Sequence, residues 1–172
     1  YPQKLADCCE KLNTVRNTLR ERGWQVDETD PLRITVQAPD GLSGRELAEQ
    51  LRQHNIECEY ADPEFLVLMA TPENRPEDFQ LLLTALGENH RPYSEKNPLP
   101  LAKADSALSI RKALFCPHET IPTEAALGRI CAAPAVSCPP AIAIAVPGEI
   151  IGERAVALCR YYGFDTMEVV ME

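Results

Sequence analysis

Apolar side chains recur at steps of three or four positions across residues 2–22, the spacing that places them on one face of an α-helix. Pro2 suits the first turn of such a helix, and Gly23 is a typical residue just past its C-terminal end. Trp24 and Val26 then alternate with polar neighbours, so we predict that a strand begins there. The apolar stripe consists of Leu5, Cys8 or Cys9, Leu12, Val15 or Arg16, and Leu19.

The pattern then changes to a period of two. Residues 32–38 alternate between apolar and polar side chains, which predicts a half-buried strand, and residues 39–41 have the composition of a turn. Ser43 and Glu46 stand at the spacing of a capping box before an apolar run. We therefore predict a helix that begins at Ser43 and runs to about His54.

A hairpin and a third helix are predicted next. Residues 56–60 alternate, residues 65–70 are a strand-length apolar run, and the turn sequence at 62–64 separates them. Pro76 opens a helix with acidic residues in its first turn, and Gly87 ends it. A small antiparallel or mixed sheet covered by helices on one face, of split-βαβ type, satisfies this order.

The predicted fold class is α+β, with two parts joined by a linker. Residues 1–88 form the small sheet covered by helices, residues 89–106 show little periodicity and are the linker, and residues 107–172 form a Pro-rich C-terminal α+β subdomain. In that subdomain we expect a strand or short helix at 107–115, a brief helix from Thr123 to near Gly128, extended chain at 130–136 and 142–146, a helix at 151–162 and a strand at 165–171.

Charge narrows the classes of partner. The formal net charge of the 172 residues is -9, and an anionic surface repels phosphate, so neither nucleic acid nor an acidic membrane is an expected partner.

No apolar run approaches the ~20 residues that cross a bilayer. Residues 2–23 are too polar for a secretory signal, and we expect a cytoplasmic protein. Because Tyr1 is not Met, the chain is expected to be a piece of something longer.

The sequence gives only weak evidence for a metal site or a reactive thiol. The seven cysteines are odd in number and include no CxxC, which favours free, packed thiols in a reducing compartment. Cys116 and His118 flank one proline and are the best local hint of a metal site, but His118 is expected in a loop and no metal is expected. The chain also lacks a Gly-rich phosphate loop, GxSxG and HExxH. We therefore predict no catalytic, cofactor-binding or metal-ligating residue in this chain.

Two segments resemble one known family. "DPLRITVQAPDGLSGRELAEQL", within residues 30–86, and "TEAALGRICAAPAVSCPPAIAIAVPGEII", residues 123–151, are similar in content and order to motifs in the C-terminal region of the Orn/Lys/Arg decarboxylases. These are pyridoxal-phosphate enzymes of the aminotransferase-like fold. The motif positions to which the resemblance assigns a structural or interface role are Arg129, Pro139, Pro140, Pro147, Gly148 and Glu149.

The resemblance also implies how this segment is built. The prolines flank a strand as a rigid edge, since proline lacks an N–H and fixes φ. The turn at Pro147-Gly148 leads into the last helix, with Glu149 near the positive end of that helix. Cys138 stands where the family has Tyr, which puts any role of that Tyr in doubt.

What the resemblance implies for function depends on what this chain lacks. The family holds its cofactor through a Lys in a Ser-x-His-Lys motif, and no lysine here has that context. The implied function is therefore the non-catalytic C-terminal portion of a decarboxylase of ornithine, lysine or arginine, which completes the active-site entrance and a homodimer interface. Its implied partners are its own N-terminal pyridoxal-phosphate domain and a second subunit, and the chain alone would bind no cofactor and be inactive.

Two other readings stay open at this point. One is a stand-alone α+β module that senses amino acids or polyamines, which the pattern of residues 24–88 allows. The other is a thiol or metal protein.

Overall fold

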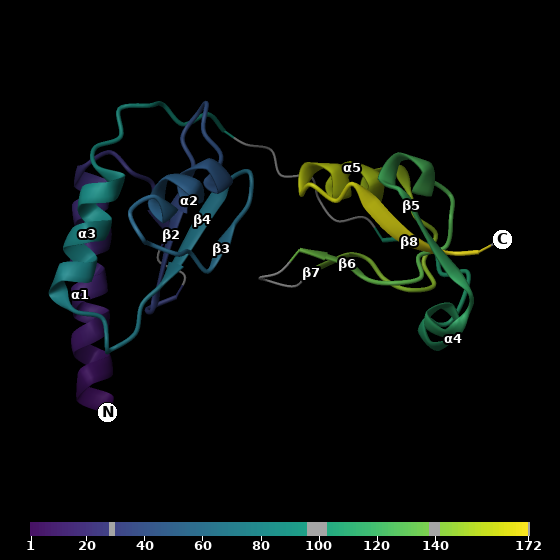
Figure 1. The fold of residues 1–172 in the computed structure, drawn as a ribbon, viewed down its shortest axis with the longest axis horizontal. Coiled ribbons are helices and arrows are strands. Elements are labelled where there is room, and N and C mark those ends of the chain that lie inside the picture. The colour runs from purple at the N-terminus through teal and green to yellow at the C-terminus, as the bar shows by residue number, and fades with distance from the viewer. Residues whose placement is uncertain (28–29, 96–102, 138–141, 172) are drawn as a thin grey trace. The chain divides into compact units, whose positions relative to one another are not determined.

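A computed structural model of the chain describes residues 1–27, 30–95, 103–137 and 142–171. The chain divides into two compact units, Tyr1–Glu95 and Lys96–Glu172 (Figure 1). The boundary falls inside the segment 89–106 that the sequence marks as a linker. Helices and strands are mixed in both units (Figure 1), which confirms the α+β class.

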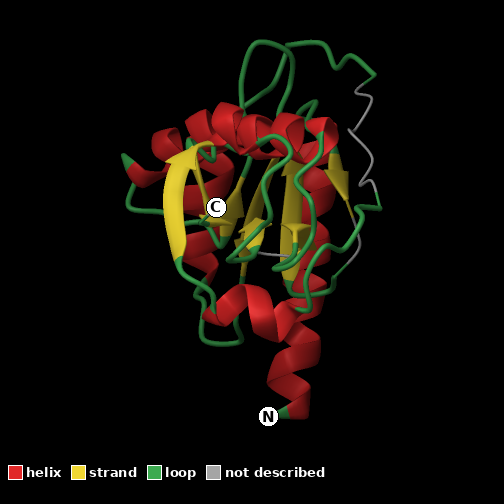
Figure 2. Ribbon diagram, turned by 90° about the vertical axis from the view of Figure 1, so that its right-hand side faces the viewer, coloured by secondary structure: helices red, strands yellow, loops and turns green. Residues whose placement is uncertain are grey.

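The first unit begins with a long helix at the N-terminus of the chain (Figure 2). Its elements follow the predicted order: α1 (Pro2–Glu21), β1 (Val26–Asp27), β2 (Arg33–Gln37), α2 (Gly44–Arg52), β3 (Tyr60–Ala61), β4 (Phe65–Met69) and α3 (Pro76–Leu86). The capping box at the start of α2 is present, with Ser43 Oγ accepting from Glu46 N–H and the Glu46 carboxylate accepting from Ser43 N–H. This is the geometry that the spacing of the two residues predicts.

The strand predicted at 56–60 is shorter than expected. Its ladder with β4 begins only at Tyr60, which pairs with Val67. The reason lies at the end of α2, where Asn55 has a φ of 59° and Ile56 N–H still donates to Leu51 O. Residues 56–58 therefore complete the helix end before the chain can extend.

The sheet of the first unit has the strand order β1-β2-β4-β3, with every neighbouring pair antiparallel. Since β2 and β3 both run against β4, they run parallel to each other on either side of it, so β2, α2 and β3 form the predicted split βαβ unit. The sheet and all three helices contribute to one core, in which Leu12, Leu19, Val36, Leu47, Leu51 and Leu66 are almost fully buried. One face of the sheet thus packs against helices, as predicted.

Arg16 departs from the apolar stripe in which it stands. Its side chain is only 2% exposed, yet it is charged. Its guanidinium donates to the carbonyl oxygens of Asp30, Pro31 and Arg33, and to the side chain of Asn13. These bonds use both Nη atoms, while Nε has no hydrogen-bond partner among the described residues. Hydrogen bonding of the Nη groups offsets much of the cost of burying the cation and ties α1 to the turn before β2.

The second unit contains two antiparallel strand pairs, β5 with β8 and β6 with β7. Its elements are α4 (Ile110–Phe115), β5 (His118–Pro122), a 3₁₀ helix η1 (Thr123–Ala126), β6 (Ala135–Ser137), β7 (Ile142–Ala145), α5 (Glu153–Tyr161) and β8 (Thr166–Val170). A strand or a short helix was expected within residues 107–115, and the structure has the helix, which Ser109 caps. The core of this unit centres on Ala126, Cys131, Ala145, Ile151, Cys159, Met167 and Val169.

The prediction of a loop around His118 is wrong. His118 is the first residue of β5, and it pairs with Val170 of β8. Residues 118–122 alternate exposed and half-buried positions, a pattern obscured in the sequence by prolines at both ends. The strand is stabilised by a partner almost fifty residues later in the chain, which local pattern does not reveal.

Among the helices that the structure describes, none is long and apolar enough to cross a bilayer.

Candidate functional site

The motif-bearing turn before α5 is closed twice by Glu149. Glu149 N–H donates to Val146 O at 3.1 Å, and its carboxylate accepts from Val146 N–H at 2.9 Å. Helix α5 begins later, with Gly152 as its N-cap. The hydrogen bond found for the carboxylate therefore stabilises the turn around Pro147 and Gly148, and Glu149 itself lies three residues before the N-cap of the helix.

Gly148 is the point at which three segments of the second unit meet. Its N–H donates to Cys131 O at 2.8 Å, and its carbonyl accepts from Ala107 N–H at 2.8 Å and Leu108 N–H at 3.2 Å. Its φ is +94°, and a Cβ there would collide with Leu108 O. Both observations require glycine, because a side chain neither adopts that φ readily nor fits the space.

The side chain of Arg129 contacts both strands of the β5–β8 pair. Its Nη2 donates to Glu119 Oε1 at 2.8 Å and to Val170 O at 2.9 Å. Only 21% of its side chain is exposed, so this ion pair is better shielded from water than most in the protein. Arg129 thus joins β5 to the end of β8 and stabilises the sheet.

The remaining motif positions divide between the core and the undescribed part of the chain. Pro147 is buried beside Gly148. Pro139, Pro140 and Cys138 lie outside the described residues. The structure thus brings Pro147, Gly148 and Glu149 together in one turn, while Arg129 serves the strand pair.

A cavity of about 240 Å³ lies beside this turn, and Glu149 is one of its lining residues. Its floor is apolar, formed by Ile144, Ala145 and Leu158. Two cations and two anions surround the opening: Lys103, Arg154, Asp105 and Glu149. Such a mixed set attracts neither a cation nor an anion selectively.

Whether this chain could hold pyridoxal phosphate depends on its lysines, because a lysine amine binds that cofactor. A cofactor lysine needs an enclosed site in which its amine is desolvated. The lysines that the structure describes, Lys4, Lys11, Lys103 and Lys112, are all exposed, and Lys4 contacts Glu73 at 3.5 Å. The described residues therefore do not fit the cofactor, and no catalytic step through it follows from this chain.

None of the cysteines that the structure describes forms a disulfide bond. Burial raises the pKa of Cys159 to about 11, and burial is also the main cause of the raised pKa values of Cys8 and Cys58. A raised pKa suppresses the thiolate, which is the reactive form.

Within the described residues no group of three or more His, Cys, Asp or Glu side chains is placed to hold a metal, and His118 faces Glu168 at 3.9 Å.

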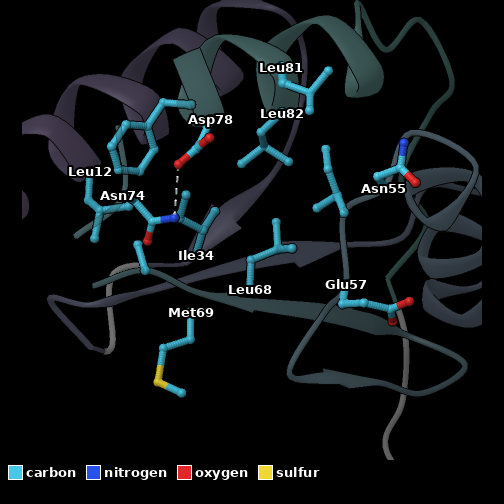
Figure 3. A pocket seen from close by; sticks show the side chains of 13 residues that line it. Leu12, Ile34, Asn55, Glu57, Leu68, Met69, Asn74, Asp78, Leu81 and Leu82 are labelled. Atoms are coloured by element: carbon cyan, nitrogen blue, oxygen red, sulfur yellow. Dashed lines mark hydrogen bonds between the residues drawn. The ribbon is translucent and has the colours of Figure 1, made fainter. Parts of the chain in front are cut away.

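A larger cavity, about 360 Å³, lies in the first unit (Figure 3). Its lining comes from α1, β2, β4, α3 and the segment after α2. None of the sequence-predicted site residues lies there. Sequence reasoning missed it because each contributing residue reads as ordinary core or ordinary surface in its own segment.

Comparison with known proteins identifies the family. Residues 93–168 match the family model described as "Orn/Lys/Arg decarboxylase, C-terminal domain". Residues 93–168 therefore form the C-terminal domain of this family. The resemblance carried by the two sequence motifs is thereby confirmed.

Curated relatives extend the similarity into the first unit. The chain is 31% identical over 141 residues to the arginine decarboxylase of Bacillus subtilis, which covers 74% of this chain. It is 29% identical over 140 residues to the arginine decarboxylase of Halalkalibacterium halodurans, covering 76% of this chain. Each alignment covers only 28% of the relative, so this chain spans little more than a quarter of their length.

Solved structures share the fold. The constitutive lysine decarboxylase of E. coli superimposes with a TM-score of 0.69 at 14% identity, over 96% of this chain and 38% of its own. The lysine decarboxylase of Francisella novicida gives a TM-score of 0.64 at 14% identity, over 99% of this chain and 40% of its own.

Proposed function

We propose that this chain is the non-catalytic C-terminal portion of a pyridoxal-phosphate-dependent decarboxylase that acts on a basic amino acid, with arginine the first substrate to test. The observation that carries the proposal is the similarity to arginine decarboxylases, at 31% identity over 141 residues. That similarity runs through both units of the chain. Lysine and ornithine remain in the proposal because the family description includes all three.

The lysine positions support a division of labour between this chain and a preceding domain. The described lysines are exposed, so the amine that holds the cofactor would come from the part of the protein that precedes this chain. When bound there, pyridoxal phosphate supplies the electron sink that decarboxylation needs. The residues of this chain supply a scaffold instead, with Gly148, Glu149 and Arg129 fixing its second unit.

In the longer protein this chain would complete the active-site entrance and a homodimer interface. Exposed apolar side chains on and near α4 support a contact role, since Ile110 is 56% and Phe115 is 78% exposed. Exposed large apolar side chains that gather on one helix are typical of surfaces that are covered in an assembly.

The test compares three proteins: the full-length protein, a version that ends before Tyr1, and the 172-residue chain alone. Release of CO₂ from L-arginine, L-lysine and L-ornithine is measured for each, together with cofactor absorbance. We expect turnover of a basic amino acid only by the full-length protein, and a colourless, inactive 172-residue chain. Sedimentation would show a dimer for the full-length protein and a weakened one for the shortened version.

Two outcomes would contradict the proposal. One is decarboxylation, or aldimine absorbance, by the 172-residue chain alone. The other is a pure full-length protein, loaded with cofactor, that turns over none of the three amino acids.

A further inference from the structure

The cavity of the first unit has an apolar floor that reaches the core. Leu12, Ile34, Leu68 and Leu82 line it, and each is buried, with less than a tenth of its surface exposed. In Figure 3 the side chains of Ile34, Leu68 and Leu82 lie close together across the middle of the cavity. A volume of about 360 Å³ falls within the range of roughly 300–1,000 Å³ that holds small organic ligands.

The rim of the cavity is polar and carries one sign of charge. Asp78 and Glu57 are carboxylates, and Asn55 and Asn74 are amides. Of the 13 lining residues, none is basic. The lining thus combines a methylene-compatible floor with a negative rim, which is the complement of an aliphatic cation.

Asp78 is the rim carboxylate that is best fixed. Its Oδ2 accepts from Arg75 N–H at 2.9 Å and from Asn74 Nδ2 at 3.4 Å, the latter drawn in Figure 3. The hydrogen bond from the Arg75 backbone is the main cause that lowers the pKa of Asp78, so the carboxylate is charged at neutral pH.

Two arginines near the rim have to be considered, because they compete for the same carboxylates. Arg75 Nη2 lies 3.6 Å from Asp78 Oδ1, and Arg52 Nε lies 3.0 Å from Glu57 Oε1. Both arginine side chains are at least half exposed, at 76% and 51%. Exposed pairs of this kind contribute little and exchange readily with water or a ligand cation.

We propose that this cavity binds a small aliphatic amine, with the methylene chain on the floor formed by Ile34, Leu68 and Leu82 and the ammonium group at the Asp78 carboxylate. The ammonium donates hydrogen bonds to Asp78, and the opposite end of the molecule faces the open side of the rim near Glu57. An apolar ligand has no charge to pair with Asp78, and an anionic ligand is repelled by the two lining carboxylates, since none of the lining residues is basic.

A role for this cavity as a product site rests on the proposed function. Its affinity for an aliphatic amine does not. Removing the carboxylate of a basic amino acid leaves an aliphatic amine, so the ligand class is that of the proposed reaction's product. A site for the product outside the catalytic domain would allow the enzyme to respond to product level. The chemistry of the cavity itself does not depend on the reaction.

The experiment uses the 172-residue chain with ¹³C-labelled isoleucine δ1 methyl groups. Ile34 and Ile56 line the cavity, while the other seven isoleucines lie within residues 110–151 and serve as an internal control. The probes are 1,5-diaminopentane, hexylamine and hexanoate. We expect saturable shifts of the Ile34 and Ile56 methyl signals with the two amines, and unchanged signals with hexanoate.

Two variants test the role of charge. Asp78→Asn removes the rim charge and should weaken amine binding about tenfold, the effect of losing one charge-assisted hydrogen bond. Glu77→Gln removes the same charge from the neighbouring, exposed position of the first turn of α3, which does not line the cavity, and should leave affinity unchanged. Methyl spectra of both unliganded variants verify that the first unit is folded.

A folded Asp78→Asn chain that binds the amines as tightly as the unaltered chain would overturn the proposal, as would shifts of equal size with hexanoate or no shift of Ile34 and Ile56 at all. These results are independent of decarboxylation. A full-length protein without turnover would refute the proposed function and leave the amine site standing.

Discussion

The carbonyl oxygen of Leu108 occupies the space into which a side chain on Gly148 would project. The same carbonyl group belongs to a residue whose N–H donates to Gly148 O at 3.2 Å, so the two backbones are held in direct contact. The Pro147-Gly148 turn is thus fixed by its partner segment as much as by its own sequence. This contact explains why glycine follows proline here better than turn propensity alone does.

Replacing Gly148 with alanine should destabilise the second unit. A φ of +94° costs roughly 1–2 kcal/mol for a residue with a Cβ, and the collision with Leu108 O adds to this cost. Urea unfolding monitored by circular dichroism measures the change in the free energy of unfolding. Gly152→Ala is the matched control, because nothing lies within 4 Å of its added Cβ. Equal stability of the two variants would show that the contact is unimportant.

Replacing Arg129 with methionine should lower the free energy of unfolding by about 1–3 kcal/mol, since it leaves the half-buried Glu119 and Val170 O without their donor. Arg160 provides the comparison. It pairs with Glu124 at 3.4 Å, and both side chains are more than 60% exposed. Arg160→Met should therefore change stability by only about 0.5 kcal/mol or less. A larger loss for Arg160→Met than for Arg129→Met, measured by thermal unfolding, would contradict this assignment.

Replacing Ser43 with alanine removes the cap of α2 and should cost about 1 kcal/mol. Because Ser43 Oγ accepts from Glu46 N–H at 3.2 Å, the loss should appear in the unfolding of the first unit. Tryptophan fluorescence reports on that unit directly, since Trp24 is the protein's one tryptophan and is buried in its core. Ser94→Ala would be a poor control, because Ser94 Oγ donates to Asp40 within the same unit. Ser106→Ala is preferred, because the bond that it removes, from Ser106 Oγ to Leu108 O, lies in the other unit. An unchanged fluorescence midpoint for Ser43→Ala would contradict the capping role.

The first unit should lose stability in acid. Hydrogen bonds from the Ser43 side chain and backbone lower the pKa of Glu46 below its ordinary 4.5, and those from Arg75 and Asn74 lower the pKa of Asp78 below 3.8. A depressed carboxylate pKa in the folded state stabilises that state above the unfolded pKa, and the benefit disappears as pH falls through the folded pKa. Urea midpoints followed by Trp24 fluorescence should thus fall from pH 6 towards pH 3, and less so in Ser43→Ala. A midpoint that rises over this range would be inconsistent with both carboxylates.

Cys159 should be among the last thiols to react in the folded chain. Burial raises its pKa to about 11, so very little thiolate is present near neutral pH. Cys9 and Cys116 are less buried and should be alkylated first. Short exposure to iodoacetamide followed by peptide mass spectrometry gives the order. Early labelling of Cys159, with Cys9 still free, would show that the core of the second unit opens readily.

Much of the secondary structure of this chain could be predicted because it is encoded locally. The helix at Pro2–Glu21, the capping box of Ser43 and Glu46, and the stop at Gly87 all depend on residues within a few positions of one another. Periodicity, capping and backbone preference act over that range, so a single sequence contains their signal.

Contacts between distant segments could not be predicted in this way. The pairing of His118 with Val170, the carbonyl partners of Arg16 and the partners of Arg129 each depend on residues that are far apart in the chain. The cavity of the first unit is the extreme case, because its floor and rim come from several segments that are separated in the sequence. Local free energies select helix, strand or turn, but a binding surface exists only where the packed core brings separate segments within reach of one another.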